Sequence, residues 1–330
     1  MEIQEKFLTE LAHKLGSKRK VAKAIMDTLE ISQDSCYRRT RGETQFSIEE
    51  LQKLCLKYHI SFDTLIAAPD KNQIFFTKRD LTDLDYNFTK YLEDILVEFQ
   101  KIQVLSGAKL TIASQDLPIF KLFNFPQLTR FKFYFWSQHI VHKKDKIGDK
   151  FKFEKLNTEL WNLANNIHIA YAKIPSDEIL NPDTLKGLTR EIVAHYKNDG
   201  FDSKETALKL LHSVRKLTDH MEEECIEGAK KIIGHEALGK DNYRCYLNRS
   251  YIPDNTVLVE TNEYNSVFLT HNVMNFLSTN NSKYIEDTRL TITGFKRNSD
   301  LITNEKNAKI REAFFKSIRN HIAIAEGQIN

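Results

Sequence analysis

The stretch SQDSCYRRTRG, residues 32–42, decides the fold of the amino-terminal part of this chain. Ser32 belongs to the residue types that cap the beginning of a helix, and Gly42 can adopt the positive φ angle that ends one. We therefore expect a short helix with a polar beginning at Gln33 and Asp34 and a basic end that carries three arginines. Such a helix is typical of an element that reads base edges in the major groove of DNA.

Helical patterns lie on both sides of this stretch. Apolar residues recur at helical spacing over residues 20–29, and another helix is expected over residues 5–15. Residues 47–50 form a capping-box pattern that begins a further helix, and residues 61–67 are expected to form a last short one. The sequence therefore predicts an all-α helix-turn-helix domain of five short helices over residues 1–70.

This order of elements resembles the Cro/repressor-like (XRE-type) helix-turn-helix family of bacterial and phage transcriptional regulators. The resemblance covers about residues 5–68, and it rests on the Ser-Gln-x-Ser run at Ser32, the glycine at Gly42, and the segment from Ser47 to Leu65. It implies that Gln33 contacts adenine. It also implies that Ser32 and Ser35 bond to phosphate or to base edges.

The chain departs from the family pattern at two positions. Arg39 stands where the family usually places an apolar core residue, and Thr40 stands where it usually has an acid. An alternative buried face runs from Cys36 to Thr40. The sequence therefore leaves open which of Tyr37, Arg38 and Arg39 faces DNA.

The chemistry of the expected contacts can be stated residue by residue. The amide of Gln33 matches the donor and acceptor of adenine, a contact that discriminates by about 1–3 kcal/mol, and Asp34 can accept a hydrogen bond from cytosine N4. The arginines of this helix can reach guanine or a backbone phosphate. The basic residues 18–20, which precede the helix in sequence, can contact a neighbouring phosphate. The alternative is that these charges only solvate a surface. The predicted DNA-contacting residues are Lys18, Arg19, Lys20, Ser32, Gln33, Asp34, Ser35, Tyr37, Arg38 and Arg41.

Net charge excludes a uniformly basic domain. The chain carries a formal net charge of +3, and residues 1–70 hold 11 Lys and Arg against 11 Asp and Glu. A local basic patch remains. Because one small domain with such a patch binds DNA weakly, we expect a homodimer that places two recognition helices about one helical turn of DNA apart.

Composition also bears on location. No run of 18 apolar residues occurs, and the chain begins with a charged amphipathic segment, so the sequence predicts neither a membrane span nor a signal peptide. The four cysteines show no Cys-x-x-Cys spacing. Free thiols in a reducing compartment are expected, and a cytoplasmic location with them.

Residues 71–80 are predicted to be a linker to a second domain. In the helix expected over residues 81–106, apolar residues recur every seventh position at Leu81, Phe88, Ile95 and Ile102. Two interpretations stay open, since a heptad of this length suits a dimer seam and an ordinary core helix equally well.

Residues 81–330 are predicted to form a larger α+β domain that binds an effector or mediates oligomerisation. Helices are expected over residues 157–172, 185–197, 203–233 and 307–321, and strands over residues 110–113, 243–247, 256–260, 266–270 and 290–293. The aromatic residues between Phe120 and Trp136 either fill the core or line a pocket for an apolar effector.

The larger domain offers few catalytic patterns. Residues 234–241 resemble a phosphate-binding loop, but Asp241 replaces the residue that would hold magnesium. His139 and His142 lack the further ligands of a zinc site. No nucleophile-elbow or dinucleotide-binding pattern occurs. We therefore expect no enzymatic activity, no cofactor and no metal.

These observations predict a dimeric, sequence-specific DNA-binding transcriptional regulator whose partners are double-stranded DNA and a possible small-molecule effector. Its larger domain would then sense a signal or dimerise, an expectation that rests on analogy. The alternative hypothesis is a protein-interaction or antitoxin-like module that uses the helix-turn-helix domain as a partner-binding surface.

Overall fold

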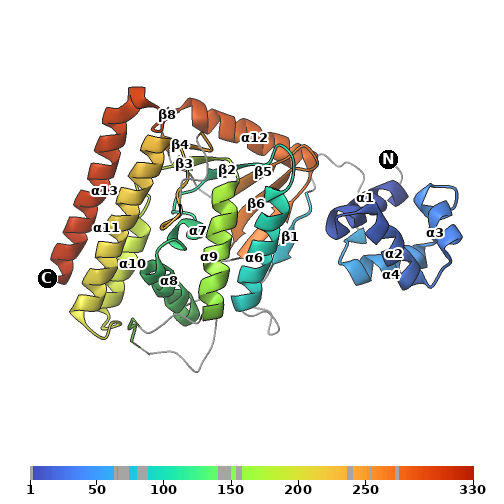
Figure 1. Ribbon diagram of the computed structural model, residues 1–330, viewed down its shortest axis with the longest axis horizontal. Helices are drawn as coiled ribbons and strands as arrows, with labels where there is room; N and C mark the ends of the chain where they lie inside the picture. Colours follow the sequence, from blue (N-terminus) through green and yellow to red (C-terminus); the bar gives the residue numbers. More distant parts are fainter. Residues whose placement is uncertain are drawn as a thin grey trace. The chain divides into compact units, whose positions relative to one another are not determined.

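The computed structural model describes residues 3–62, 65, 74–79, 88–139, 150–153, 158–235, 241–250, 252, 255–271 and 275–330. The chain divides into two compact units, Met1–Phe75 and Phe76–Asn330, here called unit 1 and unit 2 (Figure 1). The described part of unit 1 is helical, and unit 2 combines helices with an eight-stranded mixed sheet. The order of a helical domain followed by a larger α+β domain is therefore as predicted.

Unit 1 contains the helices α1 (Ile3–Leu15), α2 (Lys18–Leu29), α3 (Gln33–Thr40) and α4 (Ile48–Tyr58) in its described residues. Side chains cap three of them, because Ser17, Ser32 and Ser47 each accept a hydrogen bond from a backbone N–H in the first turn. The predicted capping box of α4 is present. Gly42 has a φ of +78°, as expected for a residue that follows a helix end. Most of the fifth expected helix lies outside the described residues.

The core of unit 1 forms mainly from α1, α2 and α4. The short α3 contributes one buried side chain, Cys36, which is 1% exposed. The helix α3 therefore packs on unit 1 with one side only. The buried members of this core are Phe7, Leu11, Val21, Ile25, Cys36, Phe46, Leu51, Leu54, Cys55, Ile60 and Leu65.

The sheet of unit 2 has the strand order β1-β7-β6-β5-β2-β3-β4-β8. Its central strands β2, β3 and β4 run parallel, and Leu110, Ser176 and Tyr243 lie in register across them. The remaining neighbours are antiparallel. The strands are β1 (Thr77–Arg79), β2 (Lys109–Ala113), β3 (Ser176–Leu180), β4 (Tyr243–Asn248), β5 (Thr256–Glu260), β6 (Ser266–His271), β7 (Asn275–Thr279) and β8 (Ser299–Leu301).

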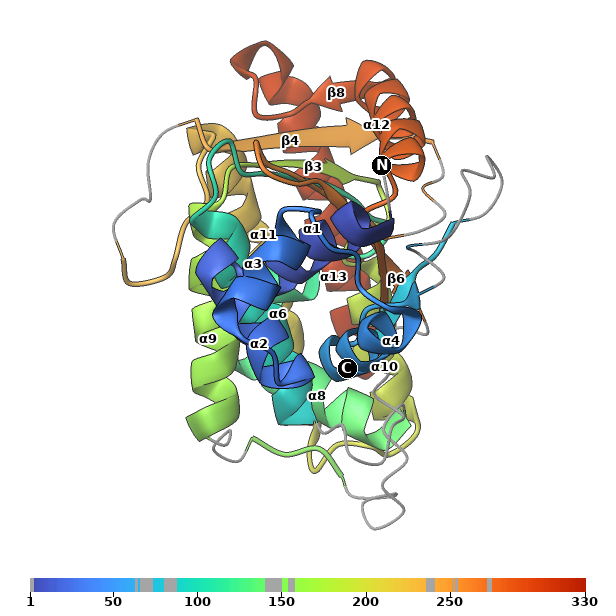
Figure 2. The ribbon, with the colours of Figure 1, turned by 90° about the vertical axis from the view of Figure 1, so that its right-hand side faces the viewer.

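Helices cover both faces of this sheet (Figures 1 and 2). The helix α12 (Ser282–Arg297) packs on one face, where Ala113, Ile179 and Leu258 join its core. Leu110 and Tyr243 point to the opposite face, which carries the other helices. These are α6 (Phe88–Gln103), α7 (Ile119–Leu122), α8 (Pro126–His139), α9 (Thr158–Lys173), α10 (Lys186–Lys197), α11 (Lys204–Glu227) and α13 (Ala308–Ile329).

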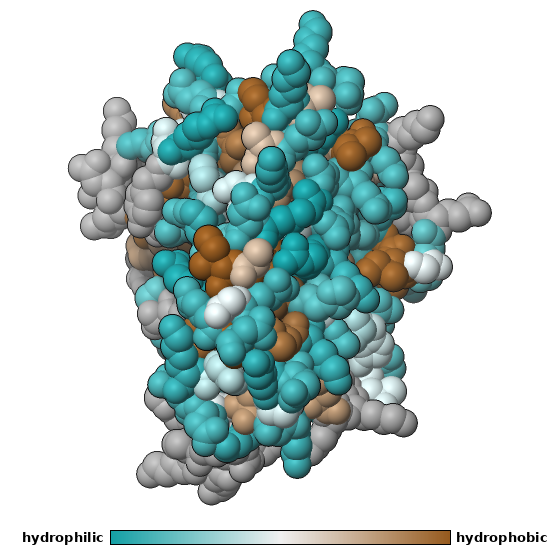
Figure 3. Space-filling model, turned by 90° about the vertical axis from the view of Figure 1, so that its left-hand side faces the viewer, coloured by the Kyte–Doolittle hydropathy of each residue, from teal (hydrophilic) through white to brown (hydrophobic). Residues whose placement is uncertain are grey.

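The outer surface on the side of α13 is mostly hydrophilic, with separate apolar spots (Figure 3). Scattered exposed apolar residues are normal for a globular protein. Within the described part of the chain, no helix combines the length and the apolarity that crossing a membrane requires.

The helix α6 contains the described heptad residues of the segment 81–106. Its heptad residues Phe88, Ile95 and Ile102 pack within unit 2, in a core shared with Ala164 and Ile167 of α9. The core-helix interpretation is therefore the one that the structure supports. Periods of 3.5 and 3.6 residues differ too little over three heptads to separate the two from sequence. Leu81 lies outside the described residues.

The predicted linker is too long at its carboxyl end. Thr77–Arg79 forms the edge strand β1, in which Thr77 pairs with Ser278 of β7. These residues therefore belong to unit 2. Three residues are too few to show a strand periodicity, and this strand exists only through its distant partner.

Four of the five strand predictions are confirmed, and one is wrong. Strands β2, β4, β5 and β6 lie where expected, whereas residues 290–293, predicted as a strand, belong to α12. Leu-Thr-Ile-Thr favours a strand locally. Asn281 caps α12, however, and the buried residues Ile285 and Ile292 are seven positions apart, so packing favours the helix.

The four helices predicted after residue 150 each begin one residue before the helices α9, α10, α11 and α13. The helix α11 ends at Glu227 rather than at residue 233, because Gly228 adopts a φ of +63°. The helix α13 continues to Ile329, beyond the predicted end at residue 321.

Candidate nucleic-acid interface

The outer face of α3 consists of Gln33, Asp34, Tyr37, Arg38 and Arg41, all of which are exposed. At about 100° per residue these positions fall within an arc of about 140°. The residues on this face therefore offer one amide, one carboxylate, one phenol and two guanidinium groups to a partner. Five of the predicted DNA-contacting residues lie together here.

The inner face of α3 settles which arginine turns inward. Arg39 donates from Nη2 to Glu50 Oε1 (2.8 Å) and from Nε to Glu50 Oε2 (3.2 Å), and the two side chains are 16% and 23% exposed. Its Nη1 also donates to Ser35 Oγ (2.6 Å). Arg39 thus lies beside Cys36 on the inner face, whereas Tyr37 and Arg38 lie outside. Ser35, predicted to contact DNA, is half-buried and turned toward Arg39.

Glu50 connects α3 to α4. Burial alone would raise the pKa of the Glu50 carboxyl, but hydrogen bonds from Arg39 and from the Ser47 backbone N–H outweigh it and hold the pKa below its ordinary value. The carboxylate is therefore ionised at neutral pH. The Glu50 side chain thus completes the capping box of α4 and, through Arg39, fixes the orientation of α3.

Contacts within the outer face are weak. Ser32 uses its hydroxyl oxygen as the cap that accepts from the Ser35 N–H (3.3 Å). Gln33 Nε2 donates to the hydroxyl of Tyr37 (3.3 Å). Arg41 lies 3.7 Å from Glu43, and both side chains are at least half exposed, so this ion pair contributes little. These side chains can rearrange at low cost when a partner binds.

The beginning of α2 carries the remaining predicted cations. Arg19 and Lys20 are exposed, and the Lys20 backbone N–H donates to Ser17 Oγ (3.3 Å). Lys18 is the first residue of α2, but its side chain lies outside the described part of the structure. The helix α2 packs against α3. The predicted phosphate contacts therefore belong to the same compact unit as the outer face.

Sequence reasoning missed Gln4, a buried polar residue of α1. Its Nε2 donates to the carbonyl of Arg39 (2.8 Å) and to that of Thr44 (3.1 Å), and its Oε1 accepts from the Phe46 N–H (2.8 Å). Gln4 thereby holds both ends of the loop between α3 and α4. No pattern near position 4 signals this role, because all three partners are distant in sequence.

A second surface of unit 1 lies along α4. An apolar groove of about 650 Å³ is lined by residues of α4 and the segment after it. Ile48 and Leu56 border it, although they are 71% and 70% exposed. The sequence predicted the helix but not this groove. Its lining residues are Ile48, Gln52, Cys55, Leu56, His59, Ile60, Ser61 and Phe62.

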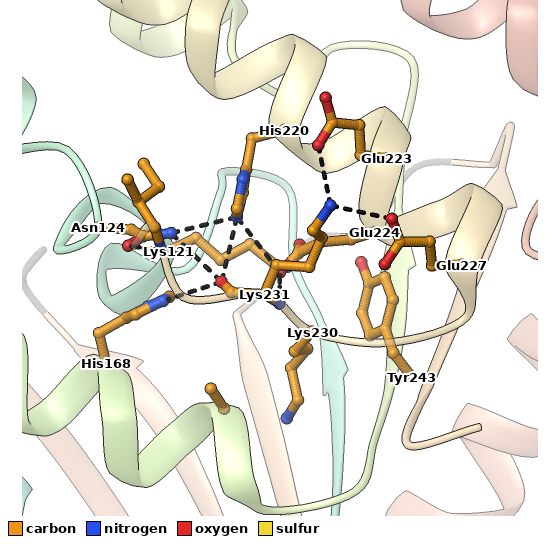
Figure 4. Close-up of polar contacts among 12 residues, drawn as sticks. Lys121, Asn124, His168, His220, Glu223, Glu224, Glu227, Lys230, Lys231 and Tyr243 are labelled. Atoms are coloured by element: carbon orange, nitrogen blue, oxygen red, sulfur yellow. Dashed lines mark hydrogen bonds and ion pairs between the residues drawn. The ribbon is translucent and has the colours of Figure 1, made fainter. Parts of the chain in front are cut away.

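Unit 2 contains a buried ionic network that the sequence did not predict (Figure 4). Lys121 of α7 lies 2.7 Å from a carboxylate oxygen of Glu224 and 3.4 Å from one of Glu178, and all three side chains are at most 3% exposed. Tyr171 and Tyr243 donate to Glu178. A buried pair is tolerated when hydrogen bonds satisfy its remaining atoms, as these do.

The network continues toward a loop after α11. Lys230 donates to the carbonyls of Tyr171 (2.8 Å) and Ile174, and burial lowers the pKa of this lysine to about 7. Burial also lowers the pKa of His168 to about 4, so its imidazole is neutral at pH 7. Asn124 Nδ2 and His220 Nε2 lie 3.3 Å and 3.2 Å from the carbonyl oxygen of Lys231 (Figure 4).

This network ties five elements together rather than facing an open site. Its central side chains are enclosed, and among the described residues no group of three or more His, Cys, Asp or Glu is arranged to hold a metal ion. Such enclosed, satisfied groups specify one packing of α7, α9, α11, β3 and β4. The absence of enzymatic activity stays a prediction.

The other sequence candidates are distributed as follows. Residues 236–240 of the loop that resembles a phosphate-binding loop, and residues 140–149, which include His142, lie outside the described residues. The side chain of His139 is not described either. The aromatic stretch fills the cores of unit 2, where Phe123 and Phe131 are fully buried. The core-filling interpretation of these aromatics is therefore confirmed.

Comparison of the chain with protein-family models, with curated proteins and with solved structures gave no match.

Proposed function

We propose that this chain is a sequence-specific DNA-binding transcriptional regulator in which α3 enters the major groove. The observation that carries the proposal is the outer face of α3: Gln33, Tyr37 and Arg38 are exposed while Cys36 and Arg39 hold the opposite face. Glutamine and arginine are the side chains that read adenine and guanine edges. A short helix attached along one edge leaves these groups accessible to DNA.

Phosphate contacts complete this binding mode. Arg19 and Lys20 at the beginning of α2 would neutralise backbone phosphates, which supplies affinity but no sequence preference. Unit 1 offers few such cations, so binding as a homodimer follows for useful affinity. We propose that unit 2 supplies the dimer contact, an effector site, or both, in a cytoplasmic protein.

Salt-dependent binding to random duplex DNA tests the phosphate contacts. Replacing Lys20→Ala removes one cation, so affinity should decrease equally on all sequences, and the slope of log K against log salt should become shallower by about 0.9. Lys216→Ala, which removes an exposed charge from α11 of unit 2, is the matched control and should leave the slope unchanged. An identical slope for Lys20→Ala and wild type would remove Lys20 from the interface.

The groove along α4 favours one other function. Ile48 and Leu56 border an exposed apolar groove, a feature of helix-binding protein surfaces rather than of DNA-binding ones. A protein-interaction module would use it and would show little salt-dependent DNA affinity. Leu56→Asp should then abolish capture of the protein partner, whereas a DNA-binding protein should keep its duplex affinity with this change.

A further inference from the structure

A second pocket lies in unit 2 at the amino ends of the three parallel strands. Lys109, Ser176 and Tyr243 begin β2, β3 and β4, and all three line this pocket of about 540 Å³. Its size is within the range of about 300–1,000 Å³ that small-molecule sites have. Pro175 and Leu301 give it an apolar side.

One buried carboxylate of this lining, that of Asp177, is contacted by three cations, of which Lys109 and Arg244 also line the pocket. Asp177, whose side chain is 2% exposed, accepts from Arg244 Nε (2.8 Å) and Nη2 (3.0 Å) and from Lys296 Nζ (2.6 Å). Lys109 Nζ lies 2.9 Å from the same carboxylate. The exposed carboxylate of Asp241 also lines the pocket. Lys109 and Arg244 line the pocket together with Asp177 and Asp241, and Lys296, which does not line it, adds a third positive charge beside Asp177.

The lining also has hydrogen-bond donors to spare. Arg244 uses Nε and Nη2 on Asp177, and a guanidinium carries five N–H groups, so those on Nη1 remain. The Arg244 side chain is 51% exposed and the Lys109 side chain 32% exposed, so both are accessible.

We propose that this pocket binds a phosphorylated small molecule. The phosphate would accept from Arg244 Nη1 and from the Lys109 ammonium, and the organic part would lie against Pro175 and Leu301. A tetrahedral oxyanion accepts from several directions, which suits donors that come from separate strands. Its role as an effector rests on the proposed regulatory function, whereas binding itself does not.

Calorimetry on the full chain without DNA tests this site. Inorganic pyrophosphate is the probe, succinate is the carboxylate control, and ionic strength is held constant with chloride. Pyrophosphate should bind at one site per chain and succinate should not. Arg244→Gln and Lys109→Gln should each weaken pyrophosphate about tenfold, the usual loss for one charge-assisted hydrogen bond. Lys216→Gln, a charge change on α11, should bind like wild type.

Two results would overturn the proposal. One is the absence of saturable pyrophosphate binding to the wild-type chain. The other is equal affinity in wild type, Arg244→Gln and Lys109→Gln, since a nonspecific anion effect would give that pattern. The two substitutions are made in separate variants. In each variant Asp177 keeps two of its three cationic partners, so both variants should fold. Because no DNA is present, the outcome is independent of whether α3 reads a duplex.

Discussion

At the scale of single residues, Arg39 shows how a charged side chain can occupy a position where an apolar one is expected. Its guanidinium is largely withdrawn from water, and Glu50 and Ser35 satisfy it. Removing one member of such a pair leaves the other half-buried and unpaired, which is the costly case. The pair therefore fixes which side of α3 faces outward.

A double-mutant cycle measures this pair. Arg39→Ala and Glu50→Ala should be coupled by about 1–3 kcal/mol in the free energy of unfolding, because the hydrogen bonds involve charged groups. The folded pKa of Glu50 lies below its ordinary value of 4.5, so the coupling is fully present above that pH and is lost as the pH falls through the folded pKa. Urea unfolding at pH 7 and at pH 3 checks both statements. Additive single effects at pH 7 would show that the pair does not hold α3.

At the scale of elements, caps and amphipathic periods predicted most helices of both units. The strand β3 escaped prediction because its sequence, Ser-Asp-Glu-Ile-Leu, has a polar half, yet all five residues are buried. Its carboxylates are tolerated because Lys121 and Arg244 pair with them. Partners that lie more than 50 residues away leave no local signal in the sequence.

The loop between α3 and α4 gives an element-scale prediction. Gln4→Ala removes three hydrogen bonds and leaves the buried Phe46 N–H unsatisfied. We expect a loss of about 1–3 kcal/mol in the stability of unit 1, measured by thermal unfolding. The matched control is Gln52→Ala, which truncates an exposed glutamine on α4 and should change stability by less than about 0.5 kcal/mol. Equal effects of the two changes would contradict the role assigned to Gln4.

At the scale of the whole molecule, the strand order of the sheet and the buried ionic network could not be predicted from the sequence. Lys121 and Glu224 are 103 residues apart, and the parallel register of β2, β3 and β4 brings their elements together. The helix α3 was predictable, since the helix, its cap and its glycine follow from eleven consecutive residues, whereas the side of the helix that faces outward was not. Local structure follows from local sequence, whereas non-local pairing does not.

The buried lysine of unit 2 predicts a pH dependence of global stability. Burial lowers the pKa of Lys230 from 10.5 to about 7. The positive charge of Lys121 adds to this effect, and the negative charges of Glu178 and Glu224 oppose it. Between pH 7 and pH 10.5 this lysine is protonated in the unfolded chain and neutral in the folded chain. The free energy of unfolding therefore increases as the pH rises, by at most about 1.4 kcal/mol per pH unit.

Unfolding of wild type and of Lys230→Met at pH 7 and pH 9 checks this sign. The stability of wild type relative to the variant should increase from pH 7 to pH 9. The variant keeps the length of the side chain and removes the titrating group. A constant difference across this range would show that Lys230 does not titrate there.

The most direct test of the central claim is selection of bound fragments from a pool of random duplexes. Wild type, Gln33→Ala and the control Gln52→Ala are compared at one salt concentration. We expect wild type and Gln52→Ala to enrich the same site, and Gln33→Ala to lose the preference for adenine at one position, worth about 1–3 kcal/mol, with nonspecific affinity kept. Failure of the wild-type chain to enrich any site, or an unchanged site in Gln33→Ala, would contradict the insertion of α3 into the major groove.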